Sequence, residues 1–136
     1  MFLLHRMSRV AALAVLLVFF LSCGSAHDSA EYYVLISANL QVPYWKTARA
    51  GFAAAASQMK VRSDFDGPQT FDPKAERDAL DRAVQKKATG ILVDVTDAAL
   101  LKDSINKAVA AGIPVITIDS DAPASKRLFF IGTNNY

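Results

Sequence analysis

Three aspartates stand directly after short apolar runs of this chain, and their carboxylates are the groups best placed for ligand chemistry. Asp119 and Asp121 follow residues 115–118, and Asp94 follows residues 91–93. Both runs are rich in β-branched residues, which predicts buried strands of a parallel sheet. In an open parallel α/β sheet, ligands bind beyond the carboxyl ends of the strands. We therefore predict that these carboxylates line a binding site. The alternative is that Asp119 and Asp121 only cap or solvate a loop.

A second group of candidate residues follows the first apolar run, 32–37. It comprises Asn39, Gln41, Tyr44 and the only tryptophan, Trp45. Aromatic faces stack on the C–H faces of a polyhydroxylated ligand, while amide and carboxylate groups bind its hydroxyls. The combination favours a small sugar or polyol as the ligand. Two structural alternatives remain open: Trp45 packs beneath the sheet, and Asp97 caps a helix.

Catalytic and cofactor chemistry has little support in the sequence. The two histidines, His5 and His27, precede the first predicted strand, where neither has a nucleophile or metal partner. Ser37 and Ser120 lack a general base. No G-x-G-x-x-G and no P-loop follows a strand, so a nucleotide has no phosphate-binding loop. We expect binding without catalysis, cofactor or metal.

The elements that must position these residues alternate regularly along the chain. Strands are predicted at residues 32–37, 61–65, 91–93, 115–118 and 128–131. Helix boundaries are marked by Pro43, by Asp72-Pro73, by Thr96 or Asp97 as a cap, and by Gly112 as a left-handed stop. This alternation predicts an α/β fold with an open, mostly parallel five-stranded sheet and helices on both faces. The expected strand order is the flavodoxin-like 2-1-3-4-5, which brings the candidate loops to one rim.

Three finer expectations concern burial. Ala48, Phe52, Ala55, Ala56 and Met59 recur at helical spacing and predict one apolar helix face. The run 115–118 is predicted to be covered on both faces of the sheet. The run 61–65 has interleaved charges, which predicts a strand near a sheet edge.

The N-terminus has the pattern of an export signal over residues 1–23. Arg6 and Arg9 precede a 12-residue uncharged apolar run, 10–21, which is shorter than the roughly 20 residues that a membrane span needs. Cys23, the only cysteine, ends this segment as in the lipobox of bacterial lipoproteins, where the thiol is acylated. An ordinary signal peptide is the alternative, and both interpretations export the protein. Residues 24–31 are predicted to be a tether. Without the leader the acidic and basic residues balance, and no stretch concentrates Lys and Arg, which argues against nucleic acid as a partner.

From residue 33 to residue 136 the chain resembles the N-terminal lobe of type 1 periplasmic sugar-binding proteins, the ribose-binding-like group that shares its fold with the core of lac-type repressors. The matching motifs are V-L-I-S at 34–37 with P-Y-W at 43–45, G-I-P-V-I-T-I-D at 112–119, and F-I-G-T-N-N-Y at 130–136. Ser120 and Val42 depart from the ribose-type pattern, which has arginine and asparagine there. The stretches 65–68 and 119–121 look more like the branch that includes autoinducer-2 binders.

The resemblance implies two α/β lobes that close over one sugar and deliver it to an ABC transporter permease in the inner membrane. It implies that Tyr44 and Trp45 stack on the sugar and that Asp119 binds its hydroxyls. Residues 32–136 are then the N-terminal lobe, truncated before the second lobe, in a periplasmic protein anchored by lipid at Cys23.

Two other functions fit the same pattern. An extracytoplasmic sensor of a signalling receptor would retain residues 10–21 as an anchor and continue into a cytoplasmic domain. The effector core of a lac-type repressor would need a helix-turn-helix before the first strand, where this chain has an export signal.

Overall fold

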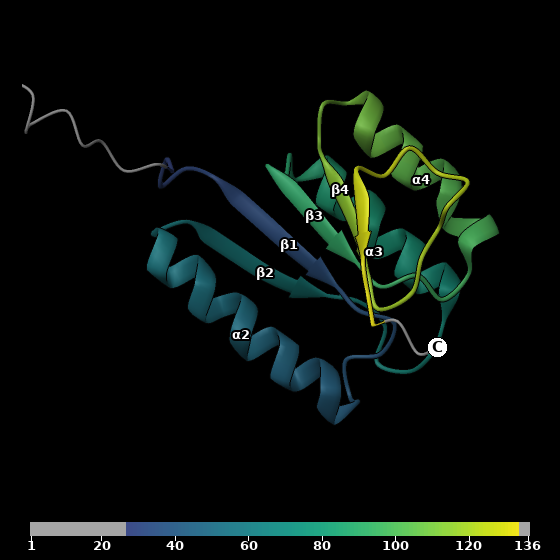
Figure 1. The fold of residues 1–136 in the computed structure, drawn as a ribbon, viewed down its shortest axis with the longest axis horizontal. Coiled ribbons are helices and arrows are strands. Elements are labelled where there is room, and N and C mark those ends of the chain that lie inside the picture. The colour runs from purple at the N-terminus through teal and green to yellow at the C-terminus, as the bar shows by residue number, and fades with distance from the viewer. Residues whose placement is uncertain (1–26, 134–136) are drawn as a thin grey trace, which may run out of the picture.

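The computed structural model describes residues 27–133, which form a five-stranded parallel sheet with helices on both faces (Figure 1). The strands are β1 (Tyr32–Ile36), β2 (Arg62–Asp66), β3 (Gly90–Val93), β4 (Val115–Ile118) and β5 (Phe129–Ile131). The helices are α2 (Pro43–Met59), α3 (Pro73–Gln85) and α4 (Ala98–Ala110). The order is β2-β1-β3-β4-β5 and every pairing is parallel, which confirms the predicted fold class.

The predicted export signal over residues 1–23, including Cys23, lies outside the described residues. So do residues 24–26 of the candidate tether and residues 134–136 of the last motif. No helix within residues 27–133 is long and apolar enough to cross a membrane.

Helix starts follow the predicted capping residues. The Asp72 carboxylate accepts hydrogen bonds from the backbone N–H groups of Lys74 and Ala75, at 3.0 and 3.1 Å, and Pro73 occupies the first turn of α3. Asp97, rather than Thr96, caps α4 in the same way. These side chains satisfy N–H groups that the first helical turn leaves without partners. Gly112 has the expected positive φ, 81°, after α4.

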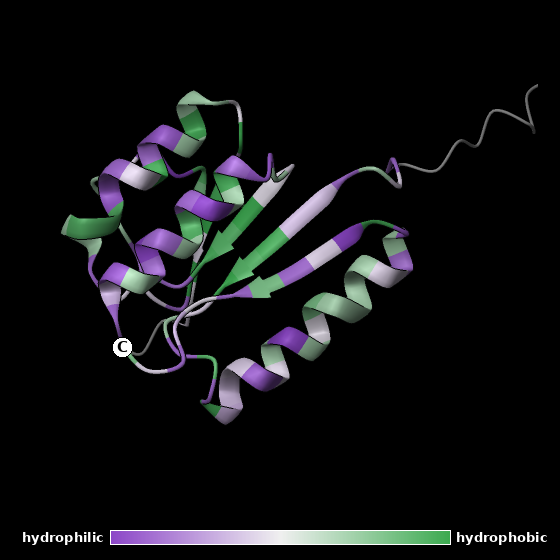
Figure 2. Cartoon of the chain, turned by 180° about the vertical axis from the view of Figure 1, so that it is seen from behind, coloured by the Kyte–Doolittle hydropathy of each residue, from purple (hydrophilic) through white to green (hydrophobic). Residues whose placement is uncertain are grey.

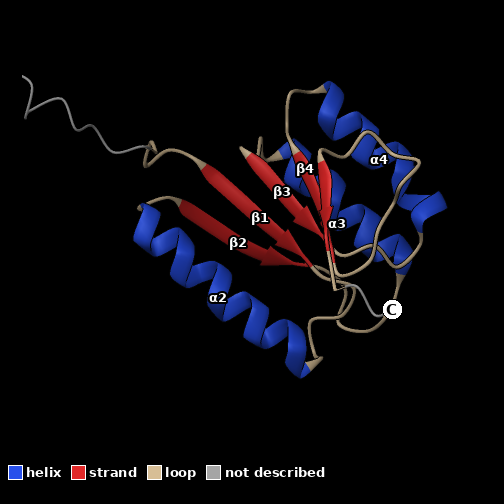
Figure 3. Ribbon diagram, in the orientation of Figure 1, coloured by secondary structure: helices blue, strands red, loops and turns tan. Residues whose placement is uncertain are grey.

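The main core lies between the sheet and the pair α3 and α4, which cover the same face (Figure 3). Side chains from β1, β3 and β4 point into it and are at most 2% exposed. They meet Leu80 of α3 and Leu101 and Ile105 of α4, each fully buried. The predicted apolar spacing of α4 therefore gives a buried face, as expected.

The opposite face of the sheet has less cover. The helix α2 packs against β1 and β2, and buries Trp45 and Ala56. Met59 of the predicted apolar face is 41% exposed and Ala55 is exposed, so that prediction was too broad. Strand β4 alternates between buried and half-buried residues, so the expectation of cover on both faces was wrong. The reason is that no helix of residues 27–133 packs on β4 from the α2 side.

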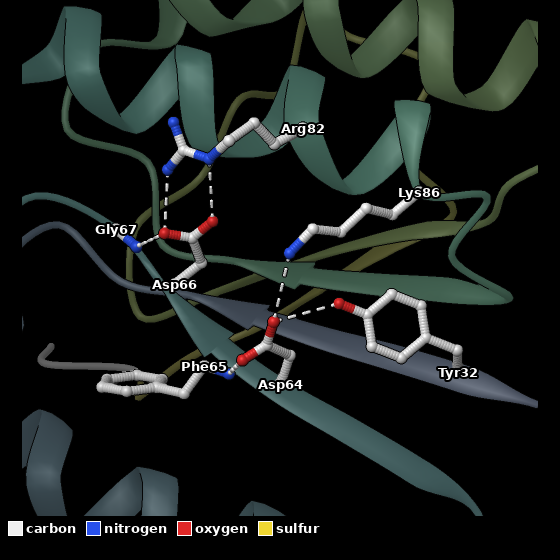
Figure 4. Close-up of polar contacts among 7 residues, drawn as sticks. All are labelled: Tyr32, Asp64, Phe65, Asp66, Gly67, Arg82 and Lys86. Carbon is white, nitrogen blue, oxygen red and sulfur yellow. Dashed lines mark hydrogen bonds and ion pairs between the residues drawn. The ribbon is translucent and has the colours of Figure 1, made fainter.

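Strand β2 is a sheet edge, as its charges predict, and Figure 2 shows its hydrophilic residues beside the more hydrophobic β1 and β3. Its two aspartates, Asp64 and Asp66, tie it to α3 and to the C-cap of that helix (Figure 4). Arg82 donates two hydrogen bonds to the Asp66 carboxylate, at 2.8 and 3.1 Å. Lys86 and the Tyr32 hydroxyl both reach Asp64 Oδ2, at 3.5 and 3.1 Å. These contacts fix the carboxyl-terminal half of β2, and with it the start of the loop that follows.

Candidate ligand-binding rim

The carboxyl ends of β1, β3 and β4 lie side by side, and we call the loops that follow them, residues 37–42, 94–97 and 119–128, the rim. The register brings these ends together, because Ile36 pairs with Val93 and Val93 pairs with Thr117. The Asp94 backbone N–H continues the ladder by donating to the Ile36 carbonyl at 3.0 Å. The strand order reverses here, because β2 lies on one side of β1 and β3 lies on the other. Such a topological switch is the usual place for a ligand in an open α/β sheet.

Asp119 presents an exposed carboxylate at the end of β4. Its backbone is left-handed, with φ 63°, and its N–H donates to the Ile131 carbonyl at 2.9 Å. Few residues other than glycine adopt this conformation, and aspartate is among those that tolerate it. Such a backbone costs about 1 kcal/mol or more and is common at functional sites. The turn directs Asp119 toward Tyr44, whose hydroxyl donates to its carboxylate at a long 3.5 Å.

Asp94 lies at the same rim but is only 4% exposed. Its carboxylate accepts hydrogen bonds from the backbone N–H groups of Val95, at 2.9 Å, and Ala38, at 3.4 Å. Burial raises the pKa of the Asp94 carboxyl, a hydrogen bond from Ser120 lowers it, and the nearby Asp119 charge raises it further. The Asp119 charge therefore acts on Asp94, and the two carboxylates belong to one electrostatic site.

The aromatic pair divides between surface and interior. Tyr44 is 58% exposed, whereas Trp45 is 4% exposed, and their rings meet edge to face with centroids 5.0 Å apart. The charge of Asp119, with burial and the hydrogen bond to the same carboxylate, raises the pKa of the Tyr44 phenol. The Tyr44 ring is thus the aromatic surface beside the carboxylates. Contact of Trp45 with a ligand stays a prediction, since its indole packs inside the lobe.

The amides of the first loop form local bonds. Asn39 Oδ1 accepts from the Gln41 backbone N–H at 2.8 Å, which closes a turn, and the Gln41 side chain donates to Gln69. Beside them, a Cβ on Gly67 would lie 2.2 Å from the Ser37 carbonyl oxygen, and Gly67 has φ 146°. Only glycine fits there, so the loop after β2 can approach the end of β1 closely.

Asp121 is engaged by its own loop. Arg127 donates to both of its carboxylate oxygens, and the Thr117 hydroxyl and the Ala122 N–H donate at 2.7 Å. The Arg127 hydrogen bond, joined by those from Thr117 and Ala122, lowers the pKa of Asp121 to about 2 against the opposing effect of burial. Asp121 therefore fixes the 119–128 loop, and its predicted contact with a ligand stays a prediction.

Sequence reasoning missed Glu76, which lies beneath the rim. It is fully buried in α3, and its Oε2 accepts hydrogen bonds from the Thr96 hydroxyl and, at 3.3 Å, from the Thr96 N–H. The signal was present, because Glu76 shares the helical spacing of Ala79, Leu80 and Ala83, which are all buried. Because glutamate is rarely fully buried, its charge argued against a core position, and this position was therefore not predicted to be buried.

The assembled rim places hydrogen-bonding groups beside an aromatic ring. Two carboxylates, a phenol and an exposed ring face meet at the carboxyl ends of the strands, and they come from Asp94, Asp119 and Tyr44. Residues 27–133 contain no cluster of three histidine, cysteine or acidic side chains that could hold a metal ion. Carboxylates beside an aromatic face suit the hydroxyls and C–H faces of a sugar.

A family model for the periplasmic binding protein domain matches residues 33–136. No curated protein matches the chain in sequence. Among solved structures, a sugar-binding protein of a sugar ABC transporter from Bacillus halodurans is 39% identical over 78% of this chain and 37% of its own length, with a TM-score of 0.74. From Geobacillus stearothermophilus, the arabinose-binding protein AraP is 36% identical, over 79% of this chain and 37% of its own, with a TM-score of 0.75.

The glucose-galactose binding protein GanP, from the same organism, is 33% identical over 80% of this chain and 39% of its own, with a TM-score of 0.75. The chain spans about two fifths of the length of these structures. The described sheet and its rim thus correspond to one part of a larger molecule in each relative.

Proposed function

Because the chain belongs to the periplasmic binding protein family, we propose that it binds a sugar or a related polyol at the rim and acts outside the cytoplasm as one lobe of a solute receptor. The observation that carries this proposal is the convergence of Asp119, Asp94 and the exposed Tyr44 ring at the switch between β1 and β3. The family and the relatives above are binding proteins, which supports binding rather than turnover as the activity.

Within this proposal the residues have distinct roles. The Asp119 carboxylate accepts hydrogen bonds from sugar hydroxyls, and Tyr44 stacks on a C–H face beside it. Asp94 holds the loop backbone at Ala38 and Val95 and adds negative potential behind Asp119. Asn39, Gln41, Asp121 and Trp45 shape the surrounding loops, and direct ligand contacts from them remain part of the proposal.

Delivery to an ABC transporter permease and a lipid anchor at Cys23 complete the proposed role. The Bacillus halodurans relative is described as part of a sugar ABC transporter, and the arabinose and glucose-galactose binders support pentoses and hexoses as ligand classes. One lobe covers a single side of the ligand, so much less of its surface leaves water than between two closed walls.

The test is a nuclear magnetic resonance titration of the full chain with arabinose, xylose, glucose and galactose. We expect saturable shifts of amide signals in the rim, and a binding free energy for the best sugar that weakens by about 1–3 kcal/mol in Asp119→Ala, because an acceptor for the sugar hydroxyls is lost. Asp103→Ala is the matched control, since Asp103 is an exposed aspartate on α4. Absence of saturable shifts with every sugar would contradict the proposal.

A further inference from the structure

Glu76 is a buried acid that the proposed sugar contacts do not use. It lies in the first turn of α3, directly behind the rim, and its only side-chain partner within residues 27–133 is Thr96. Thr96 stands two residues after Asp94 on the loop between β3 and α4. The contact therefore joins a core helix to the loop that carries a rim carboxylate.

The 94–97 loop is held at several points, and Glu76 binds near its middle. At its start, the Asp94 N–H donates to the Ile36 carbonyl at 3.0 Å. At its end, Asp97 caps α4 through the N–H groups of Ala99 and Leu100, both at 3.0 Å. Between these ends the Val95 side chain is buried in the core and the Asp94 carboxylate binds the Ala38 and Val95 N–H groups. The Glu76 carboxyl accepts from both the Thr96 N–H and the Thr96 hydroxyl, so it fixes Thr96 within the loop.

The surroundings of Glu76 disfavour its negative charge. The side chain is 0% exposed, its Oε1 has no hydrogen-bond partner, and it forms no ion pair with any described residue. The charged groups that act on it, Asp94 and Asp97, are also acids. Burial raises the pKa of Glu76 to about 7, against the two Thr96 hydrogen bonds and with the help of both aspartates. The group therefore changes charge near neutral pH.

We propose that Glu76 is a positioning residue of the rim, which holds Asp94 in place through Thr96 when protonated and loosens the 94–97 loop when ionised. Ionisation strengthens the Thr96 hydrogen bonds, but it leaves a charge in a site closed to water and adds a third negative charge beside Asp94 and Asp97. Burial is the largest of these effects, so the ionised carboxylate favours an opened loop that admits water. The effect on ligand affinity rests on the proposed function, whereas the effect on the loop does not.

The first test needs no ligand. Amide signals of the full chain are followed from about pH 5 to about pH 9, across the range in which Glu76 loses its proton. We expect the Thr96, Val95 and Asp94 amides to shift together with a midpoint near the pKa of Glu76. In Glu76→Gln, which keeps a carbonyl acceptor for Thr96 but cannot ionise, these shifts should vanish and the signals should match the acid form of the natural chain.

Two further variants separate positioning from general stability. Thr96→Val removes the hydroxyl donor with little change of shape, and we expect it to move the Asp94 amide while leaving the α4 signals in place. Asp103→Asn removes one exposed charge from α4 and should leave the titration unchanged. Rim amide signals that titrate equally in the natural chain and in Glu76→Gln would overturn the proposal. An Asp94 amide signal that is unchanged in Thr96→Val would overturn it too.

The second test adds arabinose as the probe. We expect the natural chain to bind it about threefold more weakly above the midpoint than below it, and Glu76→Gln to bind with one affinity at both pH values. An affinity that falls equally in both proteins would overturn the link between Glu76 and binding. Failure of every sugar to bind would instead contradict the proposed function, and the amide titration would still decide whether Glu76 positions the loop.

Discussion

The two faces of the sheet differ in how completely their apolar side chains are covered. On one face, α3 and α4 bury residues of β1, β3 and β4 to 2% exposure or less. On the other, α2 packs against β1 and β2, and no helix of residues 27–133 covers β4 and β5 (Figure 1). Ile116 and Ile118 are half-buried there, and their register partners Phe129 and Ile131 are 49% and 54% exposed.

The two sides of the rim therefore differ in packing. The Asp94 loop lies over the well-packed side, and the Asp119 turn lies over the side without helical cover, which we call the open side. The Asp94 loop stands over the filled core, held by α3 and α4. The Asp119 turn lies at the end of β4, which pairs with β5, and all three residues of β5 are exposed. Contiguous apolar surface at a sheet edge is a common sign of an interaction site. The following experiments test this contrast, from the largest expected effect to the smallest.

Truncation of matched isoleucines on the two faces should give unequal losses of stability. Ile105→Ala removes a fully buried side chain between α4 and the sheet, and we expect it to lower the free energy of unfolding by about 2–5 kcal/mol. Ile116→Ala removes a half-buried side chain from the open face and should cost about 1 kcal/mol. Urea unfolding measures both, and equal losses would contradict the contrast.

The covered face should also make stability depend on pH through Glu76. Its pKa is about 7 in the folded chain and 4.5 by its ordinary value, so the folded state binds the proton more tightly. Stability is therefore greatest below about pH 4.5 for this group and falls as the pH rises toward 7, by about 2–3 kcal/mol. Thermal unfolding across this range should show the fall in the natural chain and not in Glu76→Gln; a parallel fall in both would assign it to other groups.

The open side should respond to acid in the opposite sense, through Asp121. Its pKa is lowered to about 2, chiefly by the Arg127 hydrogen bond, so its contribution is present above about pH 4 and is lost as the pH falls toward 2. We expect Asp121→Asn to cost about 1–2 kcal/mol at neutral pH and to remove this acid-induced loss. Asp103→Asn provides the control on an exposed position and should unfold in acid like the natural chain. Acid unfolding of Asp121→Asn identical to that of the natural chain would contradict a stabilising Asp121–Arg127 ion pair.

The smallest effect on stability is expected at β5, where the main change is in surface hydrophobicity. The double variant Phe129→Ser, Ile131→Ser removes two exposed side chains and should change the unfolding free energy by less than about 1 kcal/mol. It should nevertheless lower the fluorescence of a bound hydrophobic dye, because Phe129 and Ile131 lie in a run of exposed apolar residues, 128–131. Unchanged dye binding would locate the apolar surface elsewhere.

Local signals explain why much of the fold was predictable. Asp72-Pro73, Asp97 and Gly112 start or end helices through bonds and backbone angles within a few residues of themselves. The period of the apolar residues separates strands from helices, and regular alternation of the two leaves few topologies. The site was predictable to the extent that strand ends in such a sheet must meet, which placed Asp94 and Asp119 at one rim.

The remaining features depend on what lies across from a residue in space. Asp121 and Asp119 are two positions apart, yet Arg127 engages one and the other is exposed. Trp45 and Tyr44 are adjacent, yet only Tyr44 shows its ring to solvent, because successive helical residues point about 100° apart. Neither division follows from residue type.

The sequence by itself determined the strand order, the helix boundaries and the edge at which the candidate residues gather, since these follow from short-range capping, from periodicity and from the handedness of strand connections. The tertiary structure alone decided which carboxylates are exposed, paired or buried, and which face of β4 has cover. Burial and pairing depend on contacts between residues far apart in the chain. The Glu76–Thr96 bond, across 20 positions, arises only when α3 and the β3–α4 loop pack together.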